Sequence, residues 1–189
     1  LMAQDKKGEF RTKLESIGAR AQFQQVRAVE ENKDFSQAAR GYEKLAAEAK
    51  DSEVRAKALN NAAVNYAKAG DRENEMRIYF AILQSSPGNE QAEQNILGIG
   101  NEHFLSGRYG EAAGVYEAYY GVYEKRLGNL KPKSQQSALE SLRSAALLRR
   151  ALRQSDKAAD DFRKIVDAAN QGIGAARDAA GEFLFDLAK

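Results

Sequence analysis

Residues 34–42 read DFSQAARGY, and the plan of this stretch returns as DRENEMRIY at residues 71–79 and as RYGEAAGVY at residues 108–116. A weaker copy, SDKAADDF, occupies residues 155–162. An aromatic residue closes each copy, and these residues are Tyr42, Tyr79, Tyr116 and Phe162. They follow one another at steps of 37, 37 and 46 residues. Self-similarity at a period of about 20 to 50 residues is typical of stacked repeats, in which each unit buries its apolar face against its neighbours.

The composition around these copies favours helices. The chain has 189 residues but only two prolines, and it is rich in Ala, Leu, Glu, Lys, Arg and Gln. No stretch shows the long alternation of Val, Ile and Thr that would indicate a strand. We therefore expect an all-α fold in which residues 1–189 form a single domain of about four repeats.

Several classes of protein do not fit this composition. The chain has no cysteine, which excludes disulfides and zinc sites built on sulfur. Its 29 basic and 27 acidic residues are interspersed, without the basic stripe of a dedicated duplex reader. No apolar run approaches the roughly 18 residues that cross a bilayer, so we expect no membrane insertion. Two compartments stay open: the cytoplasm and, for a chain cut from a longer precursor with a signal, the periplasm or envelope of a bacterium.

The second copy shows the predicted unit most clearly. Its first helix is expected over residues 56–68 and its second over residues 73–83, with a turn at Gly70 between them. Apolar residues recur on both helices at spacings of three and four, and they are Leu59, Ala62, Ala63, Tyr66, Met76, Tyr79, Ile82 and Leu83. This spacing predicts one buried stripe on each helix of a helix, turn, helix unit.

The third copy follows the same plan with a smaller residue in its first helix. Gly100 stands where the second copy has Ala63, and a residue this small lets paired helices approach closely. His103, the only histidine, falls on the same inward stripe. We expect it to pack or to make a hydrogen bond, because a single imidazole does not make a metal site.

These features resemble the tetratricopeptide repeat (TPR) family. The residues that carry the resemblance lie in the second copy, and they are Leu59, Ala62, Ala63, Tyr66, Gly70, Glu75, Tyr79, Ile82 and Pro87. The leading tryptophan of that family is absent, Glu75 stands where alanine is usual, and the step of 37 residues exceeds the usual repeat of about 34. The resemblance implies a right-handed superhelical solenoid of antiparallel helix pairs. It places repeats over residues 19–52, 56–88, 93–126 and 138–170 and a capping helix over residues 175–189.

The resemblance also implies where a ligand would bind. In that family the first helix of each repeat lines a concave groove, so residues offset from the buried stripes would face the ligand. The candidate binding residues are Arg20, Phe23, Arg27, Lys57, Asn60, Asn61, Val64, Lys68, Leu97, Asn101, Phe104, Arg143 and Arg150. The lysines and arginines in this set can bind carboxylates, and the asparagine amides can hydrogen-bond to an extended peptide backbone. The apolar residues can contact an apolar side chain of the ligand. A merely solvated inner surface is the alternative.

Three other groups of residues have a structural as well as a functional interpretation. The tyrosines at positions 116, 119, 120 and 123 share one broad helix face. We expect core there, and of the four we expect Tyr120 or Tyr123 to be the more exposed. Residues 127–134 are predicted to form a loop. Adjacent carboxylates, as in Asp160 and Asp161, point about 100° apart on a helix, so we expect them on a solvated surface.

A peptide-binding scaffold or adaptor without enzymatic activity is the leading functional hypothesis, and the cations in the groove would suit an acidic partner. One alternative is a structural module that self-associates through its ends or its convex face. A weaker one is an RNA-binding helical repeat, which would use the local basic strip Arg143, Arg149, Arg150 and Arg153. The sequence has no second histidine and no oriented carboxylate pair that would indicate catalysis. We therefore expect neither a cofactor nor a metal.

Overall fold

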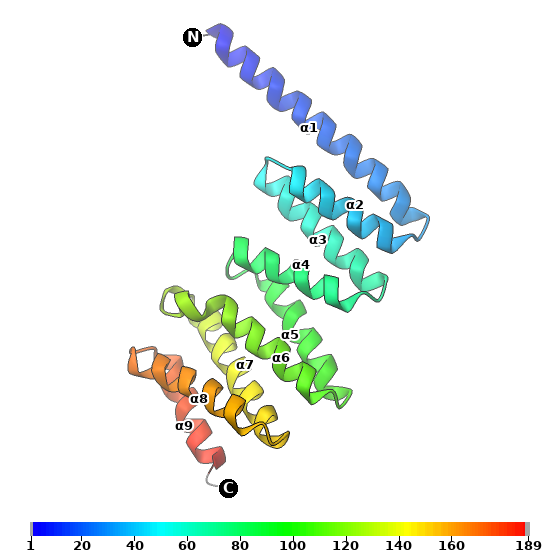
Figure 1. Cartoon of the computed structure of the whole chain (residues 1–189). Helices are drawn as coiled ribbons and strands as arrows, with labels where there is room; N and C mark the ends of the chain where they lie inside the picture. Colours follow the sequence, from blue (N-terminus) through cyan, green and yellow to red (C-terminus); the bar gives the residue numbers. More distant parts are fainter. Residues whose placement is uncertain (1, 188–189) are drawn as a thin grey trace. The chain divides into compact units, whose positions relative to one another are not determined.

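A computed structural model of the chain describes the backbone of residues 2–187 and the side chains of residues 17–181. Within residues 2–187 all regular structure is helical, which confirms the all-α prediction (Figure 1). The α-helices are α1 (Met2–Glu31), α2 (Phe35–Glu48), α3 (Ser52–Lys68), α4 (Arg72–Ser85), α5 (Glu90–Leu105), α6 (Tyr109–Tyr123), α7 (Pro132–Ala151), α8 (Ser155–Asn170) and α9 (Gly174–Leu187). A short 3-10 helix, η1 (Glu124–Asn129), follows α6.

The helices group into two compact units, residues 1–79 and residues 80–189, with the boundary inside α4. In the first unit α2 packs against both α1 and α3. In the second unit each helix from α5 to α9 packs against the next, and α7 also contacts α9. Packing between consecutive helices is what the repeated sequence leads one to expect, because each hairpin buries its apolar stripes locally. The single domain over residues 1–189 and the regular solenoid stay predictions.

The turn that precedes each copy of the repeated stretch uses the left-handed backbone region. The φ angles there are 63°, 73°, 73° and 59°, at Lys33, Gly70, Gly107 and Arg153. These positions follow one another at the same steps as the closing aromatic residues. Glycine adopts this conformation freely, whereas an L side chain pays about 1 kcal/mol for it. The hairpin turn is therefore kept in all four copies, although only two of them have the residue best suited to it.

The buried stripes follow the predicted spacing with local exceptions. Ala62, Ala63 and Tyr66 are buried as expected, but Leu59 is only half-buried. In α4 the pattern missed Ile78, which is fully buried, while Met76 is only half-buried. Helix α3 begins at Ser52, four residues before the predicted residue 56. The start of α3 was missed because its signal is a cap: the Asp51 carboxylate accepts from the backbone N–H groups of residues 53 and 54.

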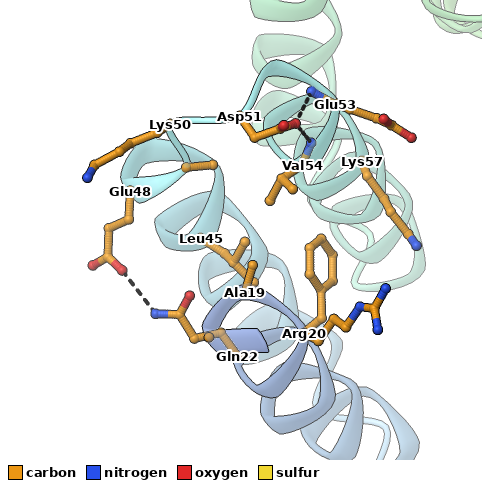
Figure 2. A pocket seen from close by; sticks show the side chains of 13 residues that line it. Ala19, Arg20, Gln22, Leu45, Glu48, Lys50, Asp51, Glu53, Val54 and Lys57 are labelled. Atoms are coloured by element: carbon orange, nitrogen blue, oxygen red, sulfur yellow. Dashed lines mark hydrogen bonds between the residues drawn. The ribbon is translucent and has the colours of Figure 1, made fainter. Parts of the chain in front are cut away.

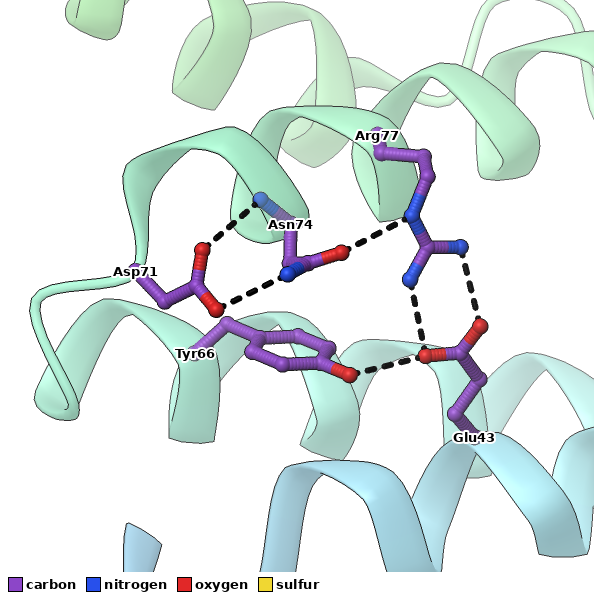
Figure 3. A network of polar contacts seen from close by, with 5 residues as sticks. All are labelled: Glu43, Tyr66, Asp71, Asn74 and Arg77. Atoms are coloured by element: carbon purple, nitrogen blue, oxygen red, sulfur yellow. Dashed lines mark hydrogen bonds and ion pairs between the residues drawn. The ribbon is translucent and has the colours of Figure 1, made fainter. Parts of the chain in front are cut away.

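A polar cluster ties α2, α3 and the start of α4 together in the first unit (Figure 3). Arg77 donates two hydrogen bonds to Glu43, at 2.9 Å and 2.8 Å, and the Tyr66 hydroxyl donates to the same carboxylate at 2.9 Å. Asn74 accepts from Arg77 at 3.0 Å and donates to Asp71 at 2.8 Å. The hydrogen bond from Arg77 lowers the pKa of Glu43, so the carboxylate stays charged at neutral pH. A bidentate pair of this kind fixes the orientation of one helix on another.

The close approach predicted at Gly100 is confirmed. A Cβ atom at this position would lie 2.5 Å from Cε1 of Tyr116, which packs across from α6. His103, one turn further along α5, is half-buried, and its buried Nδ1 atom has no hydrogen-bond partner among the described residues. The side chain therefore packs against its neighbours rather than bonding through Nδ1.

We expect Gly100→Leu to lower the free energy of unfolding by about 1 kcal/mol, because overpacking against Tyr116 outweighs the gain in helix propensity. Urea denaturation followed by circular dichroism measures the change. Gly98→Leu is the matched control: a Cβ at Gly98 meets nothing within 4 Å, so this variant should be slightly stabilised. Equal stability of the two variants would contradict a close contact at Gly100.

The tyrosines of α6 are buried more completely than the sequence predicted. The expected core is confirmed, but the ranking within it is wrong: Tyr120 and Tyr123 are 3% and 0% exposed, whereas Tyr116 is half-buried. The Tyr123 hydroxyl donates to Oε1 of Glu93 at 2.6 Å and accepts from the backbone N–H of Gly88 at 3.3 Å. The buried hydroxyl has polar partners from α5 and its N-terminal turn, and this arrangement lets a tyrosine occupy the core.

The predicted loop over residues 127–134 is also wrong for most of its length. Its first three residues belong to η1, and α7 begins at Pro132. Leu127 is 3% exposed and anchors η1 in the core, while a proline in the first turn of a helix costs no hydrogen bond. The residues that lengthen the last step from 37 to 46 are therefore mostly helical.

Candidate functional site

A pocket of about 570 Å³ lies in the first unit among α1, α2 and α3 (Figure 2), and we call it the first-unit pocket. Its lining residues come from the middle of α1, from the end of α2 with the following turn, and from the start of α3. They are Gly18, Ala19, Arg20, Gln22, Phe23, Leu45, Glu48, Ala49, Lys50, Asp51, Glu53, Val54 and Lys57. Three elements that meet at one place thus provide a concave surface.

The floor of the first-unit pocket is apolar. Phe23 and Val54 are half-buried and pack against a small core that contains Leu45 and Ala58. The Phe23 ring also lies 5.8 Å from the ring of Tyr42, between centroids. These contacts fix the Phe23 side chain, so its remaining exposed surface is a rigid platform for an apolar group.

Two cations stand at one side of this floor. Lys57 Nζ lies 5.5 Å from the centroid of the Phe23 ring, and Arg20 is exposed on α1 on the same side of the pocket (Figure 2). Neither side chain forms an ion pair with a carboxylate of residues 17–181. Exposed cations beside an apolar floor, with no carboxylate partner within residues 17–181, are suited to a ligand that carries a negative charge next to an apolar group.

The turn between α2 and α3 forms the other side of the pocket. Gln22 donates to Glu48 across α1 and α2 at 3.4 Å, and the Asp51 carboxylate caps α3 at 2.8 Å and 3.0 Å. Arg55 donates to the carbonyl of Ala49 at 2.7 Å, which holds the extended residue at the end of α2. These bonds give the pocket a defined rim before any ligand binds.

Of the binding residues predicted in the first unit, the structure brings only Arg20, Phe23 and Lys57 together at the pocket. Arg27 pairs with Glu31 at 3.4 Å on the exposed face of α1. Lys68 pairs with Glu30 at 2.7 Å and lies over the Phe35 ring at 5.4 Å. The hydrogen bond from Lys68 lowers the pKa of Glu30. The others lie on α3 outside the pocket: Asn60 and Val64 are exposed and Asn61 is half-buried.

The predicted residues of the second unit do not line the first-unit pocket. Asn101 and Arg150 are exposed, whereas Leu97 and Arg143 are half-buried. Phe104 is 43% exposed and its ring lies 5.6 Å from that of Tyr109. A smaller polar hollow of about 200 Å³ in this unit, beside η1 and the end of α8, contains none of them.

Several pocket residues were missed by the sequence reasoning, which considered only the first helix of each repeat. Leu45 and Glu48 belong to the second helix of the first repeat, and Val54 lies at the start of the next helix. The sequence signal that could have identified them is the turn at residues 49–51. Asp51 there is a helix N-cap and marks where two helices meet, and the apolar residues Leu45 and Val54 lie on either side of it.

The basic strip that suggested RNA binding is not intact, because Arg149 is buried. Its Nε and Nη2 donate to the two carboxylate oxygens of Glu117 at 2.6 Å and 2.8 Å, and its Nη1 donates to Gln154 at 2.9 Å. The hydrogen bonds that Arg149 donates to Glu117 raise the pKa of Arg149. A guanidinium held in this way inside the α6–α7 contact is not available to a phosphate, so that prediction is wrong for Arg149.

The prediction that both members of the Asp160 and Asp161 pair are solvated is wrong for the second. Asp160 is exposed and pairs with Arg163 at 2.6 Å, but Asp161 is only 4% exposed. The helix turns Asp161 toward α6 and α7, where Glu117 and Arg149 lie. Burial, together with the nearby charge of Glu117, raises the pKa of Asp161 to about 6.

No helix in the described part of the chain is long and apolar enough to cross a membrane. Among those residues there is also no group of three or more His, Asp or Glu side chains that could hold a metal ion. Comparisons of the chain with protein-family models, with curated proteins and with solved structures found no match.

Proposed function

We propose that this chain is a non-enzymatic binding module, a TPR-like solenoid of helix pairs, that holds a peptide segment of a partner protein. The first-unit pocket is the anchor point. The observation that carries the proposal is the combination of an apolar floor at Phe23 with two exposed cations, Arg20 and Lys57, that have no carboxylate partner among residues 17–181.

The ligand that fits this pocket is a segment in which a large apolar side chain is followed by a carboxylate. Covering the exposed part of Phe23 and burying one Leu or Phe of the ligand contributes about 1.5 to 3 kcal/mol. The carboxylate would lie between Arg20 and Lys57, whose exposure to solvent keeps each ion pair below about 1 kcal/mol. A pocket of this size therefore gives an affinity that is weak and sensitive to salt, as is usual for an adaptor.

The test is a selection from a peptide library on the full chain, followed by titration of the best ligand. Charge reversal at both cations, Arg20→Glu with Lys57→Glu, should weaken binding by about tenfold or more, which corresponds to about 1.4 kcal/mol. Arg40→Glu is the matched control, since Arg40 is an exposed cation of the same unit outside the pocket. Selected peptides without acidic residues, or equal affinity for the doubly reversed and control variants, would remove the pocket as the site.

A further inference from the structure

The second unit contains a buried carboxyl group that has no hydrogen-bond partner for one of its oxygens. Asp161 of α8 is 4% exposed, and its Oδ2 atom is buried without a partner among the described residues. A buried polar atom of this kind costs free energy unless its protonation state adjusts to the site. The neighbouring Asp160, exposed and paired with Arg163, is a natural reference on the same helix.

The charged groups around Asp161 come from three helices. Glu117 faces it from α6, Arg149 from α7, and Lys164 lies one turn further along α8 itself. Arg149 lies near Asp161, but its guanidinium donates its hydrogen bonds to Glu117 and Gln154. An ionised Asp161 therefore places a second carboxylate in a site where the guanidinium of Arg149 is already paired with Glu117. A neutral Asp161 can instead donate its proton toward that carboxylate.

We propose that Asp161 is a protonation-dependent contact between α8 and the α6–α7 pair: the neutral acid holds α8 in place, and ionisation loosens it. The direction follows from the pKa of Asp161, which burial and the nearby charge of Glu117 raise from the ordinary aspartate value of about 4 to about 6 in the folded chain. Because the folded state binds the proton more tightly, the stabilisation is complete below about pH 4 and is lost as the pH rises through about 6. The last helix pair is thus more firmly attached in mildly acidic solution than at neutral pH.

Hydrogen exchange of the full chain measures this attachment helix by helix. After correction for intrinsic rates, the protection of α8 amides should be about tenfold greater near pH 5 than near pH 7.5, as the shifted pKa requires. Asp161→Asn should abolish this difference, because the amide is neutral at both pH values. Asp160→Asn, the matched control, should retain it. A pH difference that persists in Asp161→Asn, or that disappears in Asp160→Asn, overturns the proposal.

A direct titration of Asp161 in the wild-type chain is a second, independent test. The carboxyl carbon of Asp161, followed by NMR in the wild-type chain, should titrate with a midpoint near 6, well above the ordinary aspartate value of about 4. Glu117→Gln removes the facing charge and should lower the midpoint of Asp161. A midpoint for Asp161 at the ordinary value of an aspartate, near 4, overturns the proposal.

Discussion

Arg149→Met is expected to lower the free energy of unfolding by about 3 kcal/mol at neutral pH. The substitution keeps much of the buried volume but removes the cation that donates to Glu117 at 2.6 Å and 2.8 Å. The carboxylates of Glu117 and Asp161 then remain close together with no guanidinium between α6 and α8. Removing one partner of a largely buried pair costs about this much because the Glu117 carboxylate, whose side chain is 27% exposed, stays partly desolvated. Urea denaturation at constant pH measures the loss.

Arg150→Met is the matched control, because Arg150 is the next residue of α7 and is exposed. Its effect should stay within about 0.5 kcal/mol, as for most surface substitutions. The loss caused by Arg149→Met should also be smaller by about 1 kcal/mol in the Asp161→Asn background, since one of the two stranded charges is gone. Equal losses for the two arginine variants would show that the Arg149 ion pair does not stabilise the second unit.

Tyr123→Phe should lower the free energy of unfolding by about 2 kcal/mol, the range for a lost hydrogen bond to a charged group. The phenol hydroxyl donates to Oε1 of Glu93 at 2.6 Å, and Glu93 is only 6% exposed. Without the hydroxyl, the Glu93 carboxylate loses a short, buried hydrogen bond that water does not readily replace. Thermal and urea denaturation of the full chain measure the difference.

Tyr120→Phe provides the comparison, because Tyr120 lies on the same helix and its ring is equally buried, at 3% exposed. No hydrogen bond of its hydroxyl is found in the described part of the chain, so the loss of that hydroxyl should change stability by less than about 0.5 kcal/mol. If Tyr120→Phe and Tyr123→Phe are equally destabilised, the bond to Glu93 is not the cause.

The helices could be predicted from the sequence wherever apolar residues recur at spacings of three and four. The stripe of Ala62, Ala63 and Tyr66 is buried as predicted, and Gly100 lies at the close contact its size suggested. The apolar spacing does not predict burial correctly where a polar group is buried because it has a hydrogen-bond partner. Tyr123 is buried because Glu93 and Gly88 accept or donate at its hydroxyl, and these partners lie 30 and 35 residues away in the sequence.

The candidate site was predictable in part for the same reason. Arg20, Phe23 and Lys57 were predicted from helix register together with the resemblance, which implies that the first helix of each repeat faces a ligand. Glu48 and Val54 line the pocket because a capped turn brings the end of α2 beside the start of α3. The register of a single helix does not predict such a contact between two helices. Asp161 was missed because a charged residue is assumed to be solvated unless a partner is known, and its neighbours belong to other helices.

The left-handed turn residues Lys33, Gly70, Gly107 and Arg153 each lie at the same distance in sequence from the closing aromatic residue of their copy. Because the turn residue and the closing aromatic residue keep the same distance in every copy, the hairpin junction has neither gained nor lost a residue. All added length between the third and fourth copies lies outside that junction, in the stretch that contains η1 and the start of α7. Residues 128–131, which follow the buried Leu127, are therefore the place to shorten or lengthen the protein, whereas the four hairpin junctions should keep their present length.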